Sequence, residues 1–229
     1  MLRPKKKITK KELKQDALIT TYAEVTNFYE RHKKNISIAI TVLAVAIIGV
    51  GLYFKNRSDN NEAATTLLGS IYAYFDNGQY QVAIDGVPEK NIQGLRSIVD
   101  NYGSSRAGEI ARFYLASAYY QLGNYDEALK DFEECSPPGE LLSVSRLSGM
   151  ADCYEAKGDH LKAGEDFEKA ASKDSRDVNV AENLSNAARN YAQAGEKEKA
   201  LELYRRLKKN FPTTTFGRDA DRYIAQLSV

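Results

Sequence analysis

Ile36–Phe54, ISIAITVLAVAIIGVGLYF, is a stretch without a charged side chain or a proline. An α-helix rises about 1.5 Å per residue, so this stretch spans about 28 Å, close to the hydrocarbon thickness of a bilayer. Backbone groups inside lipid must pair within the segment, which makes a lone span helical. We therefore predict a transmembrane helix over residues 35–55. A buried core helix would show a polar face, and a cleaved signal peptide would begin nearer the N-terminus.

The charge on the two sides of this stretch differs in sign. Residues 1–34 hold ten Lys or Arg and four Asp or Glu. The residues after the stretch hold 22 Lys or Arg and 27 Asp or Glu. Because basic flanks stay in the cytoplasm, we predict a cytoplasmic N-terminus and a domain at residues 56–229 on the opposite side. An acidic domain and a basic tail beside a membrane do not indicate a nucleic-acid partner. The expected lipid contact is the bilayer itself, through Ile36–Phe54.

The segment before the stretch, residues 1–34, combines a basic tail with a helical pattern. Thr9 and Glu12 form a capping-box pattern, and apolar residues then recur at helical spacing. Two interpretations stay open: a helix lying on the membrane surface, or a soluble helix continuous with the span. After the span, the polar segment 55–62 (KNRSDNNE) is expected to be a hinge. The residues behind the surface interpretation are Lys6, Lys7, Lys10, Lys11, Lys14, Leu13, Ala17, Leu18, Tyr22, Val25, Phe28 and Tyr29.

A tyrosine, a glycine four residues later and an alanine five residues after that recur four times in the domain. The glycines are 45, 35 and 37 residues apart, and the last three copies continue to Phe132, Phe167 and Tyr204. A period near 34 with this pattern is typical of tetratricopeptide repeats, which are stacked helix pairs. The four copies are Tyr74-Gly78-Ala83, Tyr119-Gly123-Ala128, Tyr154-Gly158-Ala163 and Tyr191-Gly195-Ala200.

The predicted fold is therefore all-α: one N-terminal transmembrane helix followed by a helix-turn-helix solenoid. The glycine ends the first helix of each pair, the alanine allows the second helix to approach closely, and the aromatic residue fills the space between pairs. We expect helices at 105–121 with 125–135, 139–157 with 160–172, and 177–194 with 197–210. The predicted domain parts are an irregular first unit at 61–101 with an insertion at 78–93, full units at 105–138, 139–175 and 177–212, and a capping helix at 215–227.

The sequence offers little for catalysis. Phosphate-binding, metalloprotease and serine-hydrolase motifs are absent from it. We therefore expect no enzyme, no catalytic residue, no cofactor, no metal site and no small-molecule substrate. Cys135 and Cys153 are expected to be free thiols, because their places on successive helices would hold them too far apart for a disulfide.

The expected site is the concave face formed by the first helices of the pairs. Its half near the membrane is aromatic and its far half is polar, and an aromatic groove can hold extended peptide. An alternative interpretation places some of these aromatic side chains in the core. The predicted partner-binding residues are Leu68, Tyr72, Phe75, Ile110, Phe113, Tyr120, Gln121, Asp152, Glu155 and Arg189; Ser117, Ser145, Ser148, Glu182, Ser185 and Gln193 extend the same face.

A cytoplasmic N-terminus, one span and an outer tetratricopeptide domain together resemble the bacterial YfgM family, the ancillary subunit of the SecYEG translocon. The run LRSIVDNYGSSRAGEIARFYLASAYYQLGNYDEAL at residues 95–129 is similar to the membrane-anchored tetratricopeptide proteins of that group. The resemblance implies a bacterial inner-membrane protein with a periplasmic domain and a chaperone-like role beside the translocon. Its partners would be translocon subunits, a periplasmic folding factor or client chains.

The sequence thus favours a membrane-anchored protein-binding module. The alternative is a structural scaffold that assembles a cell-envelope complex without binding client chains.

Overall fold

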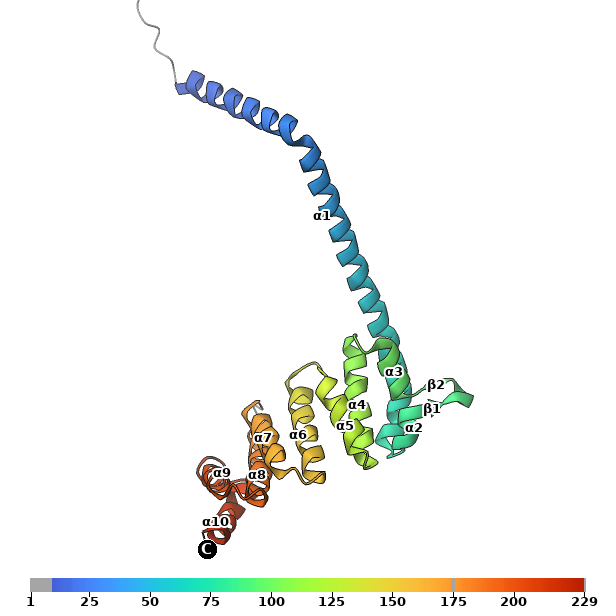
Figure 1. Ribbon diagram of the computed structural model, residues 1–229, viewed down its shortest axis with the longest axis vertical. Coiled ribbons are helices and arrows are strands. Elements are labelled where there is room, and N and C mark those ends of the chain that lie inside the picture. The colour runs from blue at the N-terminus through green and yellow to red at the C-terminus, as the bar shows by residue number, and fades with distance from the viewer. Residues whose placement is uncertain (1–9, 174–175, 229) are drawn as a thin grey trace, which may run out of the picture. The chain divides into compact units, whose positions relative to one another are not determined.

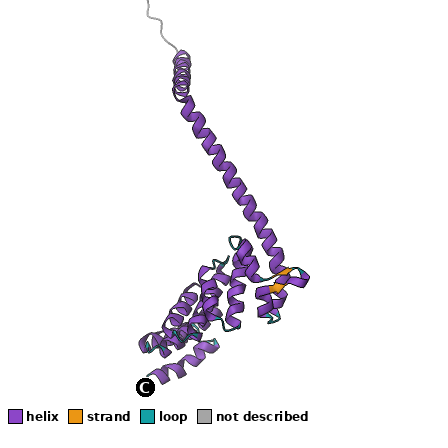
Figure 2. Cartoon of the chain, turned by 45° about the vertical axis from the view of Figure 1, so that its right-hand side comes forward, coloured by secondary structure: helices purple, strands orange, loops and turns teal. Residues whose placement is uncertain are grey.

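The computed structural model describes residues 10–173 and 176–228 (Figure 1). The chain divides into two compact units, Met1–Asn56 and Arg57–Val229. Within the described residues every regular element is helical except one two-stranded hairpin (Figure 2). The prediction of an all-α fold is confirmed.

The first helix, α1 (Lys10–Asp76), is one uninterrupted element. In the described part of the chain it alone is long and apolar enough to cross a membrane, and its most apolar stretch has a mean hydropathy of 2.5 with no buried residue. The prediction of a hinge at residues 55–62 is wrong, because that segment is helical; it contains no proline or glycine that would break a helix.

The backbone of the N-terminal segment is helical, which both interpretations of that segment predict. Residues from Lys10 onward are helical up to and through the apolar stretch. The expected cap at Thr9 and the basic residues Lys6 and Lys7 lie outside the described residues.

Three helix pairs follow in chain order and pack each against the next (Figure 1). They are α4 (Arg106–Gln121) with α5 (Tyr125–Glu134), α6 (Glu140–Ala156) with α7 (His160–Lys173), and α8 (Asp177–Gln193) with α9 (Lys197–Asn210). The last helix, α10 (Thr215–Leu227), packs on α9. Side chains cap the starts of α4, α7 and α10: Ser105, Asp159 and Thr214 each accept a hydrogen bond from the backbone amide three residues later.

The turn inside each pair is built as the repeat pattern predicts. Gly123, Gly158 and Gly195 have φ of 79°, 81° and 82°, a region that side chains other than hydrogen disfavour. The alanine five residues after each of these glycines is fully buried, and Phe132, Phe167 and Tyr204 are at most 3% exposed. Small residues therefore bring the two helices of a pair together, and the aromatic residues fill the space between pairs.

The first unit is less regular. After α1 come α2 (Tyr80–Asp85), the strand β1 (Gly86–Val87), a 3-10 turn η1 (Pro88–Lys90), the strand β2 (Ile92–Gln93) and α3 (Leu95–Tyr102). The strands pair antiparallel, with Gly86 opposite Gln93. The insertion that the sequence placed at 78–93 thus contains a short helix and a hairpin.

Cys135 and Cys153 are free and buried, as expected. Burial raises the pKa of each thiol to about 12. Neither thiol is therefore a reactive nucleophile at neutral pH.

Candidate functional site

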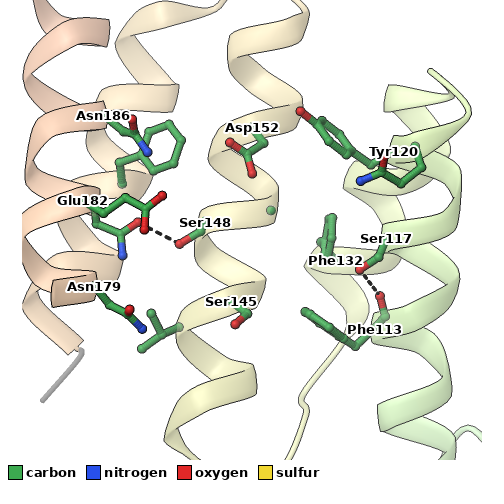
Figure 3. Close-up of a pocket in the computed structure, with 15 residues that line it drawn as sticks. Phe113, Ser117, Tyr120, Phe132, Ser145, Ser148, Asp152, Asn179, Glu182 and Asn186 are labelled. Atoms are coloured by element: carbon green, nitrogen blue, oxygen red, sulfur yellow. Dashed lines mark hydrogen bonds between the residues drawn. The ribbon is translucent and has the colours of Figure 1, made fainter. Parts of the chain in front are cut away.

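A groove of about 380 Å³ opens between the first helices of the three regular pairs (Figure 3). One wall comes from α4, the middle from α6 and the other wall from α8, while α5 and α7 each contribute one ring. The lining residues are Phe113, Ser117, Tyr120, Gln121, Phe132, Val144, Ser145, Ser148, Gly149, Asp152, Phe167, Asn179, Glu182, Asn183 and Asn186.

The floor of the groove is formed by two of the aromatic residues that recur in the second helix of each pair. Phe132 is 2% exposed, and its ring meets Phe113 edge to face at a centroid distance of 5.8 Å. The Phe132 ring lies directly over Gly149, where a Cβ atom would come within 2.5 Å of the ring carbon Cζ. Glycine at this position of α6 is thus what allows the ring to lie under the groove.

The wall from α8 carries asparagines at positions 179, 183 and 186, a spacing that places them on one face of a helix. Asn183 is only 6% exposed, and its Oδ1 accepts a hydrogen bond from the Ser148 hydroxyl at 2.9 Å. The stripe continues inward to Asn190, which is fully buried and donates to Glu155 Oε2 at 2.8 Å. The wall is therefore polar and anchored to α6 by hydrogen bonds.

Two carboxylates give the groove its charge. Asp152 and Glu182 line it from α6 and α8, and none of its lining residues is a lysine or arginine. Burial raises the pKa of Asp152 to about 6; the negative charges of Glu155 and Glu182 add to this effect, and Arg189 opposes it. Two like charges held near one another without a matching cation make the groove a negative site.

A neighbouring ion pair is neutralised internally. Arg189 donates to Glu155, with Nη2 at 3.0 Å from Oε2, and Asn190 donates to the same carboxylate. Burial alone would raise the pKa of Glu155, but these hydrogen bonds outweigh it and the pKa is lowered. Glu155 therefore stays ionised and paired, and it leaves the groove charge to Asp152 and Glu182.

The structure divides the predicted site residues between three places. Phe113, Tyr120, Gln121 and Asp152 line the groove, as do Ser117, Ser145, Ser148 and Glu182 of the extended face. Glu155 and Arg189 form the adjacent ion pair. The residues that lie outside the groove are Leu68, Tyr72, Phe75 and Ile110, together with Ser185 and Gln193 of the extended face.

The aromatic residues outside the groove pack on one another. The Tyr114 ring meets Phe75 at 5.0 Å and Tyr72 at 5.2 Å, both edge to face, and Phe75 also meets Tyr80 at 5.5 Å. Leu68 and Phe75 rest on the buried cluster of the first unit, whereas Tyr72 stays 40% exposed. These side chains fill the space between α1 and α4, whereas the groove between α4, α6 and α8 stays open.

Sequence reasoning missed the α8 asparagines and the two rings of the floor. Asn179, Asn183 and Asn186 carry a usable signal, because their four- and three-residue spacing marks one helix face. The repeat pattern identifies Phe132 and Phe167 as packing residues. It does not predict that their rings line a groove, which for Phe132 depends on the absence of a side chain at Gly149.

Comparison with protein families gives matches over the regular pairs. Models of the tetratricopeptide repeat match residues 110–135 and residues 143–211. The stacked helix pairs are tetratricopeptide repeats. Such repeats are protein-binding modules and are usually non-catalytic, since stacking creates an extended concave surface. A comparison with curated proteins finds no match.

Proposed function

We propose that this protein is a membrane-anchored module that holds a segment of a partner protein in the groove between α4, α6 and α8. The observation that supports this function is the groove itself. It joins an aromatic floor to a wall of hydrogen-bonding side chains in an array of tetratricopeptide repeats. Sites of this composition take ligands by apolar contact and use a few polar groups to orient them.

The apolar stretch of α1 would supply the anchor. The basic residues before it favour a cytoplasmic N-terminus, which puts the repeats at the outer face of a bacterial inner membrane. The resemblance to the YfgM family adds a chaperone-like role beside the translocon to this proposal. A scaffold that binds envelope proteins through other faces of the repeats is the competing function.

Site-specific photocrosslinking in cells tests the proposed function. A photoreactive residue at Ser145 or Asn179 would sit in the groove, whereas one at Glu165 or Glu202 would sit on exposed faces outside it. We expect protein crosslinks from the first pair of positions and few from the second. Crosslinks confined to Glu165 and Glu202 would instead favour the scaffold.

The proposed orientation has its own test. Protease added to spheroplasts should remove the repeat domain after Lys55 and spare an N-terminal fragment that contains the span. Protection of the repeats in intact spheroplasts, with digestion only after lysis, would place the domain in the cytoplasm.

A further inference from the structure

A polar side chain of α8 borders the groove and is held in place by α6. Asn183 is 6% exposed and lines the groove, and its carbonyl oxygen is occupied by the Ser148 hydroxyl. Among the described residues, the buried side-chain nitrogen that lacks a partner is Arg112 Nε, which lies outside the groove, so the Asn183 amide is not an unsatisfied buried donor. A ligand in the groove would lie beside this amide, whose N–H groups suit an acceptor such as a peptide carbonyl.

The two groove carboxylates have no cationic partner within the groove. Across the described ranges, Asp152 and Glu182 accept no hydrogen bond and form no ion pair, although each lines the groove. Arg189, the cation whose charge acts on Asp152, is already paired with Glu155. Two carboxylates on neighbouring helices can therefore bind a cationic group of a ligand, because the groove itself supplies no lysine or arginine.

We infer that the groove selects an extended peptide segment with a lysine or arginine, whose cationic group lies between Asp152 and Glu182 while a backbone carbonyl accepts from Asn183. This inference rests on the proposed function and specifies its ligand. The charge decides the class, since phosphorylated, acidic or nucleic-acid ligands would be repelled by both carboxylates.

The remaining groove residues fit the same ligand. Phe113 and Phe132 lie on the α4 side, and Figure 3 shows the Tyr120 ring extending from α4 toward α6, which carries Asp152. The long alkyl stem of lysine or arginine packs on apolar surface while its charged end reaches a polar partner. An apolar residue beside the basic one would then contact the floor rings, so the expected motif pairs one basic with one apolar residue.

Selection from a random-peptide display library tests this specificity, with the full-length protein held in lipid nanodiscs. We expect the wild type to enrich peptides with lysine or arginine next to an apolar residue. Asp152→Asn combined with Glu182→Gln should lose this preference and bind the enriched peptides at least about tenfold more weakly, as for other buried charge pairs. Glu202→Gln is the matched control, because it removes an exposed carboxylate outside the groove.

A second pair of variants isolates the amide. Asn183→Leu keeps the approximate size of the side chain and removes its N–H donors. It should therefore weaken the binding of basic and neutral peptides alike. Asn210→Leu changes an exposed asparagine at the end of α9 and should have no effect. Equal binding by the wild type and Asn183→Leu would overturn the role given to this amide.

The outcomes separate the inference from the proposed function. Ser145→Trp and Asn179→Trp each place an indole in the groove, and circular dichroism identifies which of them fold. Enrichment of acidic or purely apolar peptides whose binding these variants abolish would overturn the basic specificity and leave a peptide-binding groove. Absence of any enriched peptide, or binding that the indoles do not alter, would overturn the groove function and the inference together.

Discussion

The first two units and the later units use the same helix positions in opposite ways. Tyr114 on α4 and Gly149 on α6 are 35 residues apart, the same separation as the repeat tyrosines Tyr119 and Tyr154. The Tyr114 ring fills the space toward α1 by contacting Tyr72 and Phe75. Gly149 leaves that space open, and the ring of Phe132 forms its floor. The repeat therefore determines where a position faces, and side-chain size determines whether it becomes core or site.

The polar residues follow the same rule. Tyr72 is equivalent to Asp152, because the repeat spacing relates both positions through Ser117. In the first unit this position carries an aromatic ring that packs on a neighbour, whereas in the third it carries a carboxylate that faces the groove. The following variants test this contrast, from the largest expected effect to the smallest.

Phe132→Ala should have the largest effect on stability. The side chain is 2% exposed and contacts both Phe113 and Gly149, so its removal leaves a cavity under the groove. A fully buried phenylalanine typically contributes about 3–5 kcal/mol against alanine. Urea unfolding monitored by circular dichroism should show this loss, with Leu141→Ala, at a 55% exposed position, as the control. A loss near that of the control would mean that Phe132 is not part of the core.

Asp152→Asn should stabilise the folded protein at neutral pH and should weaken the binding of a basic peptide. The pKa of Asp152 in the folded chain is about 6, against an ordinary 3.8, so the folded state binds its proton more tightly than the unfolded state does. The stability contributed by this proton is complete below pH ~4 and is lost as pH rises through ~6. At pH 7 the asparagine variant should therefore gain on the order of 2–3 kcal/mol.

Measurement of the unfolding free energy from pH 4 to pH 8 checks this prediction. The charged and titratable groups around Asp152 are Glu155, Glu182, Arg189 and Tyr120. The difference between wild type and variant should grow with pH across the window from 4 to 7 and then level off. A difference that does not depend on pH would show that the carboxyl is not desolvated.

Phe113→Ala and Phe75→Ala should separate binding from packing. Phe113 lines the groove, whereas Phe75 lies in the aromatic contacts outside it. We expect Phe113→Ala to weaken peptide binding about tenfold, or ~1.4 kcal/mol, and Phe75→Ala to leave the affinity unchanged. Peptide titration of both variants in nanodiscs checks this, with thermal unfolding run on the same samples. Equal losses of affinity would extend the site into the first unit.

Two glycine substitutions should have effects of about the same size as Phe113→Ala, for different reasons. Gly149→Ala places a Cβ against the Phe132 ring, while Gly123→Ala meets no neighbour but must adopt a φ of 79°. Each should cost roughly 1–2 kcal/mol in unfolding experiments. Only Gly149→Ala should also weaken peptide binding, because the displaced ring alters the groove floor. Loss of binding in Gly123→Ala would instead indicate that the turn supports the site.

The repeat pattern made the fold predictable because its residues act locally. Gly123, Ala128 and Phe132 each meet a requirement of turn, close approach or filling that recurs at a fixed period. The continuity of α1 was missed because the polar residues at 55–62 resemble a linker, although no proline or glycine among them breaks the helix.

The candidate site was less predictable because a groove depends on what neighbouring repeats leave unfilled. Phe75 and Phe113 have the same character in sequence, but only Phe113 borders open space. That difference comes from Tyr114 on one side and Gly149 on the other, and it emerges only when the helices are packed together.

The asparagines of α8 have a consequence for the shape of any bound chain. Asn179, Asn183 and Asn186 are four and three residues apart, or ~6 Å and ~4.5 Å along the helix axis. An extended chain presents carbonyls on one side about every 6.6 Å, which is close to the larger of these steps. A helical segment has its carbonyls already bonded within itself. The α8 wall would thus bind extended, unfolded segments of a partner more tightly than segments that have already folded into helices.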